Sequence, residues 1–163
     1  MAPSPRDAHP DLKNAMEEVV AAVQKTMGRL LPEADLAENQ LYAAMRHGTL
    51  NGGKRLRPFL VMQSAALFNV DPARARRVAS ALEFVHCYSL IHDDLPAMDD
   101  AALRRGKPTV HKQYDDATAV LAGDALLTLA FEVLADAETH EDPRVRCELV
   151  SALAKASGGH GMV

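Results

Sequence analysis

The chain has 163 residues, of which 48% are hydrophobic, 4% are aromatic and none is tryptophan. Most of the hydrophobic residues are Ala, Leu and Val, a composition that favours helices over sheet. The length suits one domain or a piece of a larger one, and the formal net charge of −4 argues against nucleic acid or an anionic membrane as the main partner.

The N-terminal segment, residues 1–10, is polar and rich in proline and lacks the apolar core of a secretory signal. We therefore predict a disordered tail there, followed by a folded part over residues 11–163. Cys87 and Cys147 are the only cysteines, which fits reduced thiols in a cytoplasmic protein better than a disulfide framework.

Hydrophobic periodicity predicts six helices along the rest of the chain. His47-Gly48 offers a left-handed position at the end of the second helix, and Pro58 lies about a turn into the third. Asp71 followed by Pro72 is a capping residue before a first-turn proline, which is a strong start signal for the fourth. The predicted helices span residues 11–31, 36–46, from about a turn before Pro58 to Phe68, 72–92, 117–138 and 143–157.

No strand pattern with matching turns appears, so the expected fold class is all-α, and the wide apolar faces of the helices indicate a packed bundle. The most apolar window, residues 118–135, is interrupted by Asp124 and Glu132. We therefore predict a buried helix in this window and no insertion into a membrane.

The stretch from His86 to Arg105 carries the densest cluster of charged residues. Asp93, Asp94, Asp99 and Asp100 fall within eight residues. Carboxylates this close repel each other, by about 1 kcal/mol per pair at ~4 Å in water, unless water or a cation separates them. A bound Mg2+, which prefers oxygen ligands, would remove the repulsion; a solvated acidic turn is the alternative.

Helix geometry relates the members of this cluster. His86 and Asp93 are seven residues apart and share one face. Pro96 cannot donate a helical hydrogen bond, so the helix must kink, bulge or open near it. A bulge would bring Asp99 round to face Asp93 with a metal between them, whereas the alternative is that Pro96 merely ends the helix. Asp94 is rotated by about 100° from Asp93, so we expect it to support the site without binding the metal.

Two cationic elements accompany the carboxylates. Arg104 and Arg105 follow in a loop; such a pair is commonly a solvated surface feature, but guanidinium groups beside a bound metal form a receptor for a diphosphate. The second element is the run Gly52-Gly53-Lys54-Arg55-Leu56-Arg57, where the Gly-Gly turn permits close backbone approach and the helix start offers N–H groups to an anion. Positive charge at a helix N-terminus opposes the macrodipole, and a bound anion would relieve this conflict.

Two side chains lie on the helix that leads into the cluster. His86 either faces the same cavity as Asp93 or is a satisfied core histidine. Tyr88, with Ser89 beside it, lies more than a turn before the carboxylates. Its ring either narrows an apolar channel leading away from the metal or packs in the core.

With these residues in hand, the chain closely resembles the N-terminal half of the trans-isoprenyl (polyprenyl) diphosphate synthases, particularly the bacterial farnesyl diphosphate synthases. The matching segments, in the family's order and spacing, are GGKRLRPFLV, ALEFVHCYSLIHDDLPAMDD, LRRGKPTVH and AVLAGDALLTLAFEVLA. The resemblance implies an all-α, barrel-like bundle around a central cavity, usually as a homodimer. It also implies a prenyltransferase reaction, in which Mg2+ draws diphosphate off an allylic substrate and isopentenyl diphosphate attacks the allylic cation with loss of a proton.

The resemblance assigns roles to both charged elements. Asp93 and Asp99 resemble the Mg2+ ligands, with Asp94 in support, and Arg104 resembles the contact to the allylic diphosphate. The residues that resemble the isopentenyl diphosphate site are Gly53, Lys54, Arg57, His86 and Arg105.

Product length is a further implication of the resemblance. Tyr88 and Ser89, together with the two-residue insertion Pro96-Ala97, look like the bacterial farnesyl pattern, in which an aromatic ring limits chain length. Geranylgeranyl synthases share the insertion, so a geranylgeranyl product stays the alternative.

The family's second half holds a second aspartate-rich motif, a Lys-Thr pair and a Gln-containing helix, and none of these lies before Val163. Residues 11–163 therefore resemble about half of the enzyme, and we expect this chain alone to be incomplete for catalysis. Two alternatives stay open: a truncated, non-catalytic half-barrel that binds diphosphates or assembles with a partner chain, and a structural bundle with a solvated acidic turn.

Overall fold

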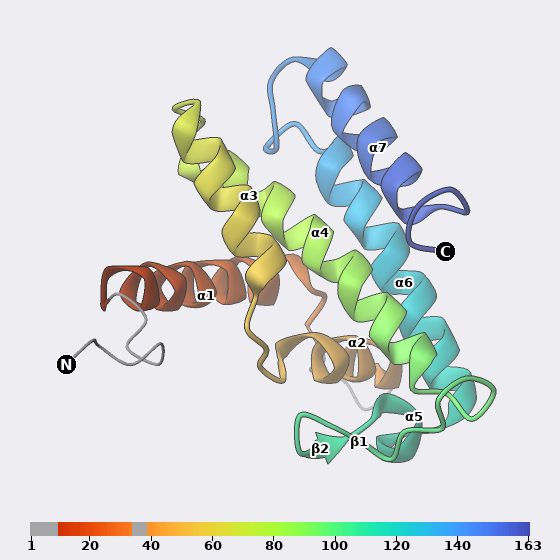
Figure 1. The fold of residues 1–163 in the computed structure, drawn as a ribbon. Helices are drawn as coiled ribbons and strands as arrows, with labels where there is room; N and C mark the ends of the chain where they lie inside the picture. The colour runs from red at the N-terminus through yellow and green to blue at the C-terminus, as the bar shows by residue number, and fades with distance from the viewer. Residues whose placement is uncertain (1–9, 34–38) are drawn as a thin grey trace.

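The computed structural model describes residues 10–33 and 39–163. Residues 1–9 of the predicted tail (1–10) lie outside the described residues. So do residues 36–38, where the second helix was predicted to start. Within the described ranges the all-α prediction is confirmed, since seven helices and one short hairpin form the fold (Figure 1). The elements are α1 (Pro10–Leu30), α2 (Gln40–Leu50), α3 (Leu56–Leu67), α4 (Pro72–Asp93), β1 (Leu103–Arg104), β2 (Lys107–Pro108), α5 (Val110–Gln113), α6 (Asp116–Ala135) and α7 (Pro143–Ser157).

Helices α4 and α6 form the centre of the fold and lie side by side (Figure 1). Both bury alanines completely, including Ala79 and Ala81 on α4 and Ala122 and Ala130 on α6. Small side chains at such positions let two helices approach closely. Helices α1 and α3 pack against α4, while α2, α5 and α7 pack against α6.

Helix α6 is, among the described residues, the one helix that is long and apolar enough to cross a membrane, with a mean hydropathy of 1.7 over its most apolar window. In the fold it contacts α2, α4, α5 and α7 and contributes buried residues along its length. Its place in the core explains the buried part of its apolar composition, as predicted for this segment, while Val120 and Leu121 lie exposed.

The start of α4 follows the predicted capping pattern. Asp71 precedes Pro72, and its Oδ1 accepts hydrogen bonds from the backbone N–H groups of Ala73 (2.6 Å) and Arg74 (3.3 Å). These hydrogen bonds favour the carboxylate and lower the pKa of Asp71 below its ordinary value. The cap fixes where α4 begins, and its length then carries the helix to the acidic cluster.

The predicted end of the second helix was wrong. Helix α2 continues through His47-Gly48 to Leu50. A Cβ atom on Gly48 would lie 2.5 Å from Cδ1 of Ile91 on α4 and 3.2 Å from Cγ2 of Val110 on α5. This glycine therefore permits close contact between helices and does not terminate one.

The hairpin β1–β2 and the one-turn helix α5 were not predicted. Leu103 pairs with Pro108 and Arg104 with Lys107 in antiparallel register. The two residues between the strands, Arg105 and Gly106, both have positive φ angles (53° and 78°), as in a two-residue type I′ turn. Strands of two residues are too short to show an alternating hydrophobic pattern.

Replacing Gly123 by Ala should destabilise the fold by about 1–2 kcal/mol, in the lower part of the range for overpacking. A Cβ atom there would lie 2.1 Å from Nε2 of His92 on α4, and the imidazole would have to give up its 3.0 Å contact with the Val120 carbonyl. Urea unfolding measures the effect. Gly28→Ala on α1 is the matched control, because no atom lies within 4 Å of a Cβ there and alanine favours the helix by about 1 kcal/mol. Equal stability of Gly123→Ala and the wild type would contradict this packing.

Candidate functional site

The acidic cluster lies at a chain reversal that follows α4. The expected bulge around Pro96 is absent from these residues: α4 ends at Asp93, and Pro96 lies in the turn after it. The turn brings the chain back on itself, because the Asp99 N–H donates to the Asp93 carbonyl at 2.8 Å and the Ala101 N–H donates to the Asp94 carbonyl at 3.1 Å. The proline therefore ends the helix, and the turn still places Asp99 beside Asp93.

The three aspartates named as site residues have different surroundings. Asp93 is half-buried, Asp99 is exposed and Asp94 is buried. The described residues contain no group of three or more His, Cys, Asp or Glu side chains placed to hold a metal ion. Mg2+ is commonly held by only one or two carboxylates together with water and substrate phosphate oxygens, so Asp93 and Asp99, whose backbones meet in the turn, are a donor set of a suitable kind.

Arg104 and Asp94 form an ion pair behind the turn. Arg104 Nε donates to both carboxylate oxygens of Asp94 (3.0 and 2.8 Å), and Nη2 donates to Oδ1 at 2.7 Å. The hydrogen bonds to Asp94 raise the pKa of Arg104. The Asp94 side chain is 5% exposed and that of Arg104 35%, so the carboxylate is held inside while the guanidinium reaches the surface.

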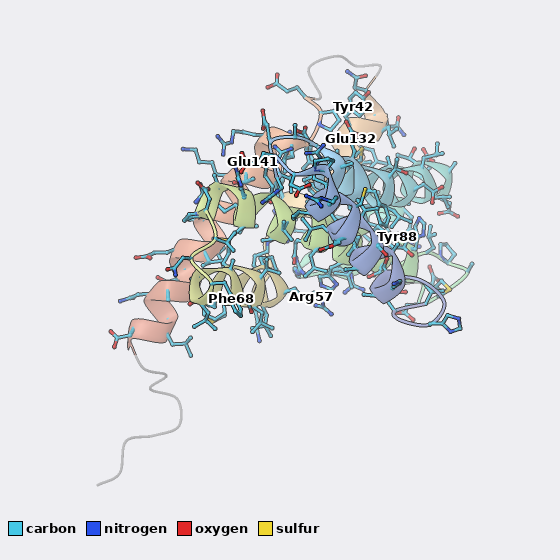
Figure 2. All side chains as sticks on the ribbon, turned by 90° about the horizontal axis from the view of Figure 1, so that it is seen from above. Tyr42, Arg57, Phe68, Tyr88, Glu132 and Glu141 are labelled. Carbon is cyan, nitrogen blue, oxygen red and sulfur yellow. The ribbon has the colours of Figure 1, made fainter. Side chains whose placement is uncertain are left out.

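The second cationic element forms a cleft of about 690 Å³ with α4 and the hairpin. Lys54 and Arg57 are exposed, and Arg57 Nη1 lies 3.5 Å from Nε2 of His86. Figure 2 shows Arg57 near the N-terminal end of α3, with Phe68 marking the other end. Arg105, from the hairpin turn, donates to the Gly52 carbonyl and also lines the cleft. The cleft therefore brings together the cationic side chains expected to bind isopentenyl diphosphate.

Position 53 requires a glycine, both because of its backbone conformation and because Arg105 packs against it. Its φ angle is 127°, and a Cβ atom would lie 2.5 Å from Nη1 of Arg105. The hairpin is held against this loop by a 2.8 Å hydrogen bond from Lys107 Nζ to Asn51 Oδ1. Consecutive arginines thus serve the two elements: Arg104 reaches the acidic turn, and Arg105 reaches the cationic loop.

Burial lowers the pKa of His86 below its ordinary value, and Arg57 lowers it further, while Glu83 opposes the shift. Both causes disfavour the imidazolium, so we expect His86 to be neutral at pH 7 in the free protein. Between the ordinary pKa and this lowered one, the unfolded chain binds more protons than the folded one, so the contribution of His86 to stability falls as the pH falls.

Inorganic diphosphate should raise the pKa of His86, because a nearby anion stabilises the imidazolium. Between the lowered pKa of the free protein and the raised pKa of the complex, the complex binds more protons than the free protein. The affinity for the anion should therefore rise as the pH falls through this range. Histidine NMR titrations with and without saturating diphosphate measure this, with His86→Gln to assign the resonance. An unchanged His86 pKa in the complex would contradict a place in the binding cleft.

Tyr88 and Ser89 lie on α4 between the two charged elements. The Tyr88 ring meets the His92 ring edge-on, with centroids 5.2 Å apart and planes at 89°, and both side chains are half-buried. Ser89 Oγ donates to the His86 carbonyl at 2.9 Å. His92 is held in turn by α6, since its Nε2 lies 3.0 Å from the Val120 carbonyl oxygen.

Sequence reasoning missed the buried ion pair between Arg55 and Glu83. Arg55 Nη1 lies 2.6 Å from Glu83 Oε1, and the two side chains are 0% and 2% exposed. Glu83 was a usable signal, because a single carboxylate among apolar residues on a buried helix needs a charged partner.

The chain is similar to known proteins over most of its length. The family described as polyprenyl synthetase matches residues 38–162. The farnesyl diphosphate synthase of Escherichia coli is 45% identical over 153 residues, which are 93% of this chain and 51% of that protein. Geranylgeranyl pyrophosphate synthase 12, chloroplastic, of Arabidopsis thaliana is 44% identical over 156 residues, 94% of this chain and 42% of that protein.

Solved structures give the same result. The apo crystal structure of an FPP/GFPP synthase from Zymomonas mobilis matches with a TM-score of 0.89 and 54% identity, covering 93% of this chain and 55% of that chain. The chain spans about half the length of the curated relatives it matches.

Proposed function

Because the chain belongs to the polyprenyl synthetase family, we propose that the full-length protein condenses isopentenyl diphosphate with an allylic diphosphate, dimethylallyl or geranyl, to give farnesyl diphosphate. The observation that carries the proposal is the pair of adjacent charged elements, one suited to a metal-bound diphosphate and one to a free diphosphate. Arg104 contacts the first and Arg105 the second. A reaction that joins two diphosphate esters needs this arrangement.

The proposal gives each residue a task. Asp93 and Asp99 would hold Mg2+, which when bound supplies positive charge against the departing diphosphate. Arg104 would contact the allylic diphosphate from its place beside Asp94. The cationic cleft would hold the second diphosphate, so that two anions that repel each other in water lie side by side. The cleft residues with this task are Gly53, Lys54, Arg57, His86 and Arg105.

Product length is proposed to depend on Tyr88 and its neighbour Ser89. The ring of Tyr88 is held by its contact with His92, whose imidazole meets the α6 backbone. A fixed ring supports a short product, farnesyl diphosphate. The relatives carry both farnesyl and geranylgeranyl names, so a geranylgeranyl product is the alternative.

Product analysis tests the function. The full-length protein is incubated with isopentenyl diphosphate, geranyl diphosphate and Mg2+, and the products are separated by liquid chromatography with mass detection. We expect farnesyl diphosphate as the main product and none when EDTA replaces Mg2+. Geranylgeranyl diphosphate as the main product would favour the alternative, and recovery of unreacted substrates would refute the prenyltransferase.

A second candidate is diphosphate binding without turnover, in a half-barrel that assembles with a partner chain. The observation that favours it is that the residues lining the cationic cleft all lie between Asn51 and Arg105, within this chain. Saturable binding of isopentenyl diphosphate by a protein that gives no product would support this candidate.

We further propose a cytoplasmic homodimer. Exposed apolar side chains on α6, among them Val120 and Leu121, support an association surface. Cys87 is buried and Cys147 exposed, and neither forms a disulfide. Burial raises the pKa of Cys87 to about 11, so this thiol is held unreactive. Sedimentation velocity should give the mass of two chains, and a monomer would contradict the dimer.

A further inference from the structure

A buried ion pair forms part of the wall of the cationic cleft. Arg55 Nη1 donates to Glu83 Oε1 at 2.6 Å, and its Nη2 donates to the Thr49 carbonyl at 2.6 Å. The side chains of Arg55 and Glu83 are almost completely shielded from solvent. Arg55 therefore joins three elements: the end of α2 through Thr49, the start of α3 through its own backbone, and α4 through Glu83.

The loop that carries the cleft cations has an unfavourable backbone. Gly52, Gly53 and Arg55 all have positive φ angles, of 85°, 127° and 48°. Such angles suit glycine but are disfavoured for an arginine. The loop also holds Lys54 and Arg57 close together, and the two cations repel each other when no anion is bound. An anchor is needed to keep this conformation in the free protein.

We propose that Arg55 and Glu83 are positioning residues, whose ion pair holds the cationic loop in the conformation that binds diphosphate. Arg55 is thus the one cation of the Lys54–Arg57 run that does not contact the ligand. The inference rests on the proposed function, because it deepens the role of the same cleft. In this view the exposed Lys54 and Arg57 bind the diphosphate, and the buried Arg55 holds the loop in place.

Replacing Glu83 distinguishes a positioning role of the ion pair from a simple effect of the net charge of the cleft. Arg55 and Glu83 line the cleft together with Lys54, Arg57 and Arg105, which makes four cations and one carboxylate. Loss of the carboxylate alone makes the cleft more positive, so charge by itself predicts tighter anion binding. Loss of the anchor predicts weaker binding. The two explanations therefore predict opposite changes in the affinity for the anion.

Calorimetric titration of the full-length protein with inorganic diphosphate measures the effect. EDTA in the buffer removes divalent metal, so that the acidic turn does not contribute. We expect the Kd of Glu83→Met to be at least tenfold higher than that of the wild type. A Kd equal to or below the wild-type value would overturn the inference.

A double variant keeps the test decisive if Glu83→Met fails to fold. Replacing both Arg55 and Glu83 by Met leaves the net charge unchanged and removes the buried charges, a replacement that is often tolerated. We expect this double variant to be helical by circular dichroism and still at least tenfold weaker in binding; wild-type affinity would overturn the inference.

Arg77→Met is the matched structural control. Arg77 also lies on α4, but it bonds Thr139 and Glu138 (both 2.8 Å) at the other end of the fold. This variant should melt at a lower temperature and bind diphosphate like the wild type. If Arg77→Met weakened diphosphate binding by the same factor, the loss of affinity would reflect general instability, and the positioning role would be overturned. A wild type that does not bind diphosphate would refute the proposed cleft itself, whereas normal binding by the variants would refute the inference alone.

Discussion

Replacement of Asp93 or Asp99 by Ala in the full-length protein should lower kcat by about 10³-fold, which corresponds to about 4 kcal/mol of transition-state stabilisation. Each variant removes one of the two carboxylates that would hold Mg2+ against the departing diphosphate. Folding should be unaffected, because both side chains lie at a turn and their removal reduces repulsion between like charges. The affinity for isopentenyl diphosphate should also stay unchanged, since the cationic cleft is a separate element.

Asp100→Asn is the matched control for these variants. Asp100 belongs to the same cluster, but its carboxylate lies 3.3 Å from Lys112 Nζ, away from the proposed ligands. Its replacement should leave kcat within about twofold of the wild type. Steady-state kinetics at saturating substrate and Mg2+ measure all three variants. Normal turnover by a fourth variant, in which Asp93 and Asp99 are both replaced by Ala, would contradict the metal assignment.

Replacement of Arg104 by Leu should destabilise the fold by about 2–3 kcal/mol. The change leaves the buried carboxylate of Asp94 without its three hydrogen bonds, and the loss of one partner from a buried pair costs about 3–5 kcal/mol. The expected value is lower because Arg104 is partly exposed, so that water can replace some of the lost interaction.

A second substitution distinguishes the ion pair from other effects of Arg104. Asp94→Asn in the Arg104→Leu background removes the unpaired charge, so more than half of the lost stability should return. Urea unfolding of the full-length protein measures the cycle. An Arg104→Leu variant with wild-type stability would show that Arg104 acts on the ligand alone and that the pair contributes nothing to the fold.

Much of the fold could be predicted from the sequence, because its helices carry local signals. Asp71 and Pro72 marked the start of α4, and the apolar pattern of α6 marked a core helix. Gly48 misled the prediction, because a glycine late in a helix is equally compatible with a helix end and with close packing. Only the tertiary position of Ile91 decides between the two.

The residues of the candidate site could be proposed from the sequence, but their contacts could not. Charge spacing singled out Asp93, Asp99 and Arg104, yet the pairing of Arg104 with Asp94 depends on a hairpin too short to predict. Arg55 was indistinguishable from its cationic neighbours in the sequence. Its side chain is buried because its backbone takes a left-handed conformation and because Glu83 lies on another helix. Long-range contacts of this kind have no local pattern.

The most direct test of the two-site account is a crystal structure of the full-length protein with Mg2+, isopentenyl diphosphate and an unreactive thio-analogue of an allylic diphosphate. The account predicts Mg2+ on Asp93 and Asp99 with the allylic diphosphate beside Arg104, and the second diphosphate in the cleft against Lys54 and Arg57. A structure in which both diphosphates bind away from these residues, or in which Mg2+ touches neither aspartate, would contradict it.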